Sequence, residues 1–199
     1  MDVGQLTDLI LDALLEGVVP VARFEFGDIS ITLQLDPFLL GVDENPLATA
    51  HNISTVILNS LAAQTVQLHL LDSPLRELEV SFVFRPGEPS FGETGFGPEP
   101  NPLLDAHQAI MRINFWDMNK EYRVRGSADH WYPFNLQHIW NHEFLHVITG
   151  EPDGEWHNFL VDETNRETDA GPPRASYDEV RLSDEPVLKF CFLPHTPIT

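Results

Sequence analysis

Apolar residues recur every three or four positions in three segments of the chain, and this spacing is typical of one face of an α-helix. The segments are residues 1–17, 45–64 and 133–150. In the second segment, Asn45 is placed to cap the helix, and Pro46 stands at the first helical position, where its missing N–H costs nothing. We therefore expect three helices, and we expect the second to lie on a sheet.

Between these segments the pattern changes to short runs that are apolar or alternate between polar and apolar residues, as strands do. Residues 21–26 and 29–35 flank a Gly-Asp pair and predict a β-hairpin. Further strand-like runs occupy residues 65–71, 77–84, 109–116, 121–126 and 186–194. Together the elements predict an α+β fold with a mixed or antiparallel sheet and a helix packed against one face.

The length of 199 residues favours a single domain that spans residues 1–199 and buries a sizeable core. Within it, residues 1–40 can form an N-terminal extension made of one helix and one hairpin. Residues 85–103 are rich in Gly and Pro and show no periodicity. We interpret this segment as a surface loop rather than as a boundary between two small domains.

Charge and composition narrow the range of partners. The chain has 31 acidic and 11 basic side chains, a formal net charge of −20. Binding to phosphate backbones or anionic lipid depends on Lys and Arg, so we expect neither nucleic acid nor a membrane as a partner. No apolar run reaches the roughly 18 residues of a membrane span, and the N-terminus has no signal-peptide pattern. We expect a cytoplasmic protein, or one exported without a recognisable signal peptide. The only cysteine, Cys191, excludes an internal disulfide and is expected to be buried.

Candidate chemistry is concentrated in residues 141–157, NHEFLHVITGEPDGEWH. A helix advances about 100° per residue, so His142 and His146 lie about 40° apart on one face and can reach one ion. Glu143 lies one step around the helix, where it can touch a water held by that ion. Zinc lowers the pKa of bound water to about 7, and a neighbouring carboxylate can then take its proton. The spacing predicts one Zn²⁺ per chain.

Two ligands one turn apart cannot hold a catalytic zinc alone, so a third must come from further along the chain. Gly150 is placed to end the helix, and the turn that follows can bring His157 back to the ion. Glu163 is the alternative if its segment is a helix aimed at the site. We favour His157, because three neutral imidazoles leave the zinc its full charge. Minor candidates are Glu151, Asp153 and Asp162.

Other polar residues have weaker claims to a role. Tyr177, Arg174 and His195 lie downstream and are candidates for stabilising an oxyanion. His138 extends the histidine series by one turn, but from there it lies too far from the ion to complete a tetrahedron. We therefore expect His138 to support a ligand or to belong to the core.

The HEFLH sequence resembles the HExxH signature of the zincin metallopeptidases, and the order of helix, strands and HExxH helix over residues 45–160 is similar to the upper subdomain of that fold. The resemblance implies zinc ligation by His142 and His146, Glu143 as the general base, and a peptide or protein as the substrate. Metzincins continue the motif as HExxHxxGxxH, whereas Thr149 and Pro152 stand at those positions here and no Met-turn follows. SprT-like proteases, which place a third His after a variable spacer, are loosely similar, but they act on DNA-bound proteins.

The sequence therefore predicts a zincin-like, zinc-dependent metallopeptidase. Two alternatives stay open: a non-catalytic protein that uses zinc to stabilise its structure or to act as an adaptor, and a metal-dependent hydrolase of another amide or ester. A structural site has four protein ligands, whereas a catalytic site keeps one position for water. Three good ligands with a carboxylate beside them favour the enzyme. The sequence gives no indication of the oligomeric state.

Overall fold

The computed structural model describes eight stretches of the chain: residues 1–16, 20–42, 45–65, 73–88, 92–97, 103–124, 131–171 and 177–182. Several sequence predictions lie outside them. The strand expected at 65–71 falls outside after its first residue, as does all of the strand expected at 186–194 with Cys191. Arg174 and His195 also lie outside the described residues.

The fold is α+β, and its main sheet is mixed. The strands that the described residues contribute to it are β1 (Val21–Phe26), β2 (Ile29–Leu35), β3 (Glu77–Val83), β4 (Gly92–Phe96) and β5 (Gln108–Asn114). Their order is β1-β2-β3-β5-β4, with β2, β3 and β5 parallel and the outer strands β1 and β4 antiparallel to their neighbours. The predicted hairpin is confirmed: β1 and β2 pair around Gly27, whose φ of 57° is the left-handed conformation that such a turn requires.

The described residues form four α-helices, and the three predicted from periodicity are among them. They are α1 (Val3–Glu16), α2 (Pro46–Ala63), α4 (Leu136–Thr149) and α5 (Glu155–Glu167). Short 3-10 helices follow β2 and β5, at η1 (Pro37–Gly41) and η2 (Phe115–Asn119). The α2 N-cap is as expected, because the Asn45 side chain accepts a hydrogen bond from the Ala48 N–H at 2.9 Å. None of the described helices is long and apolar enough to cross a membrane.

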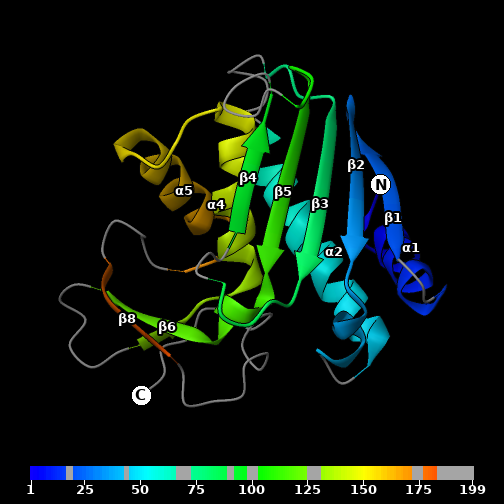
Figure 1. Ribbon diagram of the computed structural model, residues 1–199, viewed down its shortest axis with the longest axis horizontal. Helices are drawn as coiled ribbons and strands as arrows, with labels where there is room; N and C mark the ends of the chain where they lie inside the picture. Colours follow the sequence, from blue (N-terminus) through cyan, green and yellow to red (C-terminus); the bar gives the residue numbers. More distant parts are fainter. Residues whose placement is uncertain are drawn as a thin grey trace.

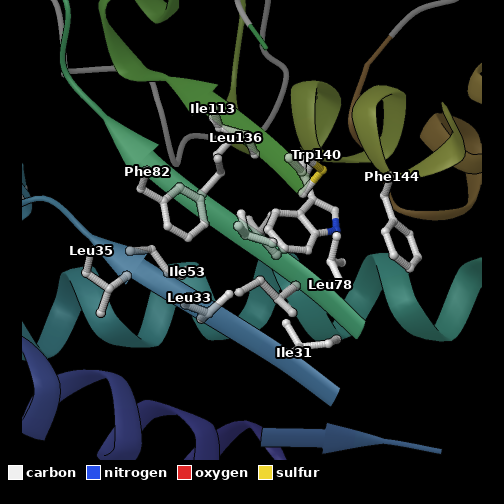
Figure 2. Packing of buried hydrophobic residues seen from close by; sticks show 14 of the residues in the cluster. Ile31, Leu33, Leu35, Ile53, Leu78, Phe82, Ile113, Leu136, Trp140 and Phe144 are labelled. Carbon is white, nitrogen blue, oxygen red and sulfur yellow. The ribbon is translucent and has the colours of Figure 1, made fainter. Parts of the chain in front are cut away.

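Helices α1, α2 and α4 share one apolar core with the sheet, and α2 and α4 pass behind the strands (Figure 1). Alternate residues of β2 are buried, so one face of this strand packs on the helices. Trp140 of α4 stacks on Phe82 of β3, with ring centroids 6.0 Å apart (Figure 2). Replacing a buried Trp by Ala typically costs about 3–5 kcal/mol, so this contact holds α4 firmly on the sheet.

A second, smaller sheet lies beside the lower end of the first in the view of Figure 1. Its strands are β6 (Lys120–Val124), β7 (Trp131–Pro133) and β8 (Tyr177–Leu182), in the antiparallel order β7-β6-β8. The buried carboxylate of Glu121 accepts a hydrogen bond from Arg181 Nε at 2.9 Å, which ties β6 to β8. This sheet brings Val180 to the wall of a cavity that residues of α4 also line.

Two sequence interpretations are corrected by the structure. Residues 85–103 are not loop throughout, because residues 92–96 form β4. This strand lacks an apolar alternation because its inner face lies against a glutamate of α4. The expectation of three helices is also too low, because α5 follows α4 within a few residues. Its buried face includes Thr164 and Asn165 beside Leu160 and Val161, which weakens the apolar stripe.

Candidate metal centre

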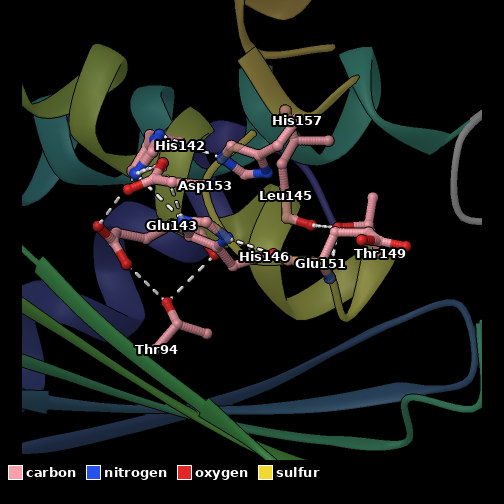
Figure 3. Close-up of polar contacts among 9 residues, drawn as sticks. All are labelled: Thr94, His142, Glu143, Leu145, His146, Thr149, Glu151, Asp153 and His157. Carbon is pink, nitrogen blue, oxygen red and sulfur yellow. Dashed lines mark hydrogen bonds and ion pairs between the residues drawn. The ribbon is translucent and has the colours of Figure 1, made fainter. Parts of the chain in front are cut away.

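Helix α4 places two histidines on one face, as its sequence predicts. Asn135 caps its N-terminus by accepting a hydrogen bond from the His138 N–H at 2.9 Å, and Gly150 ends it with a φ of 65°. His142 and His146 then lie one turn apart, with their Nε2 atoms 3.1 Å apart (Figure 3). Two imidazole nitrogens this close need a proton or a metal ion between them. Ligands of a tetrahedral zinc lie about 3.3 Å apart, so the spacing suits a shared ion.

The third histidine comes from α5. The chain reverses over residues 151–154, so that His157 lies in the first turn of α5 and faces α4. Its Nε2 lies 3.2 Å from His142 Nδ1, and its ring stacks on the His146 ring with centroids 3.8 Å apart. His157 is 1% exposed. The structure therefore brings together the three histidines that the sequence predicts as ligands.

Glu163 does not reach this cluster. It stands six residues after His157, roughly 240° around the helix, so the two side chains leave α5 in different directions. The Glu163 carboxylate instead pairs with Arg166 at 2.6 Å. Of the minor candidates, Asp162 also stays outside the cluster.

Asp153 joins the three histidines as a fourth candidate ligand. Its Oδ1 lies 3.6 Å from His142 Nε2 and 3.8 Å from His146 Nε2. One ligand atom from each of the four residues lies within 4.8 Å of the others, a grouping that can hold a metal ion. Asp153 differs from the histidines because it lies on the turn between the helices and its side chain is 64% exposed.

Glu151 takes part through its backbone rather than through its carboxylate. His146 Nδ1–H donates a hydrogen bond to the Glu151 carbonyl oxygen at 2.7 Å. This bond fixes the tautomer of His146, because the proton on Nδ1 leaves Nε2 with its lone pair. Ligating histidines usually hold their second nitrogen in this way, which orients the ring toward the metal.

Glu143 lies beside the cluster but outside it. Its carboxylate is buried, with Oε1 3.8 Å from His142 Nε2 and Oε2 accepting a hydrogen bond from Thr94 Oγ1 at 2.6 Å (Figure 3). Gly92 lies directly against the same side chain. The Glu143 side chain thus reaches from α4 toward β4, with one carboxylate oxygen facing the metal centre and the other bound to Thr94 of the strand.

A cavity of about 710 Å³ opens in front of these residues. Its walls come from β4, the segment just before α4, α4 itself, the turn after α4 and Val180 of β8. The apolar part of the wall includes Phe96, Phe134 and Ile139, while His142, Glu143 and His146 supply polar groups. Cavities of this size accommodate small ligands or several side chains of a peptide, and an apolar wall with a few convergent polar groups is typical of a binding site.

A buried network of polar side chains lies behind the centre and links α2, α4 and α5. Asn141 is at its middle: its Nδ2 donates to Asn165 Oδ1 at 2.9 Å and to Thr168 Oγ1 at 2.8 Å. Its Oδ1 accepts from Gln137 Nε2 at 3.1 Å and also from the Ser60 hydroxyl. Buried amides need such partners. Because Asn165 lies on α5, the network sets the position of the helix that carries His157.

The remaining predicted residues have different outcomes. His138 is buried and lies outside the metal cluster, as expected, with Nδ1 3.2 Å from Asn165 Nδ2 and its ring against Tyr122 and Phe134. Tyr177 begins β8, but its side chain lies outside the described part of the structure. The structure therefore leaves the proposed oxyanion role of Tyr177 as a prediction.

Sequence reasoning missed Gly92, Thr94 and the Asn141 network. The network has a detectable signal, because Gln137 and Asn141 stand one turn apart in a helix that is otherwise mostly apolar. The segment GETGF that contains Gly92 and Thr94 offers no comparable signal. Comparison of the chain with protein-family models, with curated proteins and with solved structures finds no match.

Proposed function

We propose that the protein is a zinc-dependent metallopeptidase with a zincin-like fold, in which His142, His146 and His157 hold the ion and Glu143 is the general base. The main support is the meeting of three imidazoles from two helices beside a buried carboxylate, at the wall of one cavity. Imidazole nitrogens, with or without one carboxylate, form a donor set that suits zinc.

A bound zinc ion supplies two effects, polarisation of the scissile carbonyl and acidification of a water molecule. The residues of this chain supply the proton transfers. Glu143 accepts a proton from the attacking water at Oε1, so that the water oxygen can form a bond to the carbonyl carbon. The same carboxyl then gives the proton to the leaving amine as the carbon–nitrogen bond breaks.

The edge of the main sheet favours a peptide over other amides or esters. Among the described residues, β4 is the outermost strand of this sheet on its side, pairs with β5 and lines the cavity with Gly92, Glu93, Thr94 and Phe96. An exposed strand edge can pair with an extended peptide through main-chain hydrogen bonds. A peptide bound along β4 would pass directly by Glu143.

Metal analysis combined with a peptide digest tests this proposal. Protein purified without chelators should carry about one zinc per chain, because the four candidate ligands fit one ion. It should cleave casein or a peptide library, lose that activity on chelation and recover it when zinc is restored. Parallel assays with ester and non-peptide amide substrates distinguish a peptidase from a metal-dependent hydrolase of another amide or ester. Less than about a tenth of an equivalent after zinc loading would contradict the metal site itself.

A non-catalytic, zinc-stabilised protein is the second candidate, and Asp153 is the observation that favours it. Three histidines and one aspartate make four protein ligands, which is the number in closed structural sites. Two features oppose this reading. The Asp153 carboxylate lies on an exposed turn, and a structural site gives no role to the buried Glu143 carboxylate.

The variant Asp153→Asn separates the two candidates. In a peptidase, we expect zinc affinity to fall by no more than about tenfold and peptide hydrolysis to persist, because the three histidines hold the ion and the exposed Asp153 carboxylate at most supports them. Glu155→Gln, an exposed position on α5, removes the same charge and serves as the control. A loss of zinc as large as that caused by removing a histidine would instead indicate a closed structural site.

A further inference from the structure

We propose that Thr94 is a positioning residue for Glu143, with Gly92 providing the space that the carboxylate occupies. This inference rests on the proposed peptidase function and adds a strand residue to its machinery. Thr94 would hold one carboxylate oxygen, so that the other oxygen faces the metal centre. Strand β4 would then serve as a support for the general base.

The hydrogen bond from Thr94 to Glu143 is short and well defined. Thr94 Oγ1 lies 2.6 Å from Glu143 Oε2, within the range of a hydroxyl that donates to an ionised carboxylate. The same hydroxyl lies 3.3 Å from the Glu143 carbonyl oxygen, so its single proton is directed mainly to the closer Oε2. With Oε2 engaged, Oε1 is the oxygen that remains toward His142, at 3.8 Å from Nε2.

Gly92 contacts the same side chain from the strand. A Cβ atom at this position would lie 2.5 Å from both Cγ and Cδ of Glu143 and 2.6 Å from Oε1. These distances are far below van der Waals contact, so any side chain here would displace the carboxylate. Gly92 and Thr94 are two residues apart in a strand and therefore point to the same face, toward α4.

The strand itself is fixed at both ends of this contact. Antiparallel pairing with β5 sets Gly92 opposite Ile113 and Thr94 opposite Met111, and both β5 residues are buried in the core. At the far end of β4, Phe96 lies next to Gly150, the residue that ends α4. Strand and helix thus run together past the centre, which gives Thr94 a fixed position relative to Glu143.

A positioning role has a kinetic signature. A glutamate side chain has three rotatable bonds, and a catalytic group needs to be held close to its productive geometry. Displacement by about 1 Å can cost about 100-fold in rate. Loss of the Thr94 hydroxyl, with the shape of the side chain kept, should therefore lower kcat while leaving KM and zinc content almost unchanged, because the cavity wall that Thr94 lines keeps its form and no ligand is removed.

Thr94→Val keeps the branched shape and removes the hydroxyl, and Thr94→Ser keeps the hydroxyl. We expect Thr94→Val to lower kcat by about 10- to 100-fold with KM within about twofold, and Thr94→Ser to recover most of the loss. Gly92→Ala, which crowds Glu143 without touching Thr94, should also lower kcat with zinc retained. Equal loss in the Val and Ser variants, or no loss in either, would overturn the positioning role.

A binding experiment tests the same role without any turnover. Acetohydroxamic acid chelates zinc and can hydrogen-bond to a neighbouring carboxylate, so its affinity reports the placement of Glu143. Thr94→Val should weaken its binding several-fold in the wild-type background and should have no further effect in a Glu143→Ala background, where Thr94 has no carboxylate to hold. An equal effect in both backgrounds would show that Thr94 does not act through Glu143.

The two experiments distinguish this inference from the proposed function. If the wild-type protein binds zinc and Thr94 and Glu143 show the expected coupling in hydroxamate binding, but no peptide is cleaved, the proposed peptidase function is wrong and the positioning role of Thr94 stands. If the wild-type protein cleaves peptides and Thr94→Val has the same kcat and KM, the peptidase function stands and the positioning role of Thr94 is wrong. A protein that binds no zinc would contradict both.

Discussion

Replacing Glu143 with Gln should lower the rate of peptide hydrolysis by at least about 100-fold while about one zinc per chain stays bound. The substitution keeps the size of the side chain and removes its ability to take a proton. Glu143 does not belong to the group of candidate ligands, and its nearer oxygen lies 3.8 Å from His142 Nε2. The amide oxygen of Gln can still accept the Thr94 hydrogen bond, so we expect the contact between α4 and β4 to persist.

The measurements are kcat on a cleaved peptide and zinc content by elemental analysis. Glu163→Gln is the matched control, because it makes the same chemical change on α5 at a residue paired with Arg166 and away from the centre. Loss of zinc together with activity in Glu143→Gln would make this carboxylate part of the metal site. Unchanged hydrolysis would exclude it as the base.

The parts of the site that follow from local geometry were predictable from the sequence. Helical periodicity alone places His142 and His146 on one face, and the caps at Asn45 and Gly150 depend only on neighbouring residues. The preference for His157 over Glu163 depends on the short turn after α4. In the structure His157 lies against His142, whereas Glu163 pairs with Arg166.

The parts that depend on distant contacts were not predictable in this way. The sequence predicts a loop where β4 forms, because residues 85–103 are rich in Gly and Pro and show no periodicity. GETGF itself has two glycines in five residues and little strand propensity. Its pairing comes from β5, and its composition fits the contact with Glu143, where Gly92 leaves room and Thr94 donates a hydrogen bond. The local sequence favours a loop here, whereas the tertiary contacts require a strand, and such disagreement is common at functional sites.

The turn between α4 and α5 illustrates a second limit. Asp153 was one of several acidic residues near the motif, and sequence spacing could not separate it from Glu151 or Asp162. The structure separates them by geometry, because Asp153 directs its carboxylate to the histidines while Glu151 directs its carbonyl oxygen to His146. Such a difference depends on backbone conformation at single residues of a turn.

The position of His157 depends on both local and distant contacts. Its ring is buried between α4 and α5, stacked on His146, and its helix is held by the bond from Asn141 to Asn165 and by apolar packing of Leu145 with Val161. Burying a third imidazole beside two others is unfavourable unless a shared ion or proton compensates for the lost solvation. This arrangement makes zinc affinity the most sensitive measure of its role.

His157→Ala should lower zinc affinity by more than about 100-fold, because loss of a ligand costs more than the 10- to 100-fold typical of a residue that only supports one. Glu163→Ala should stay within about twofold of wild type, since its carboxylate pairs with Arg166. Competition titration against a chromogenic chelator measures both. Thermal unfolding in the presence of chelator measures the stability of each variant without zinc. Comparing His157→Ala with the larger replacement His157→Asn then distinguishes the loss of a ligand from the effect of a cavity between the helices. The reverse pattern, with zinc lost in Glu163→Ala and kept in His157→Ala, would mean that the carboxylate is the third ligand and that α5 adopts another orientation on α4.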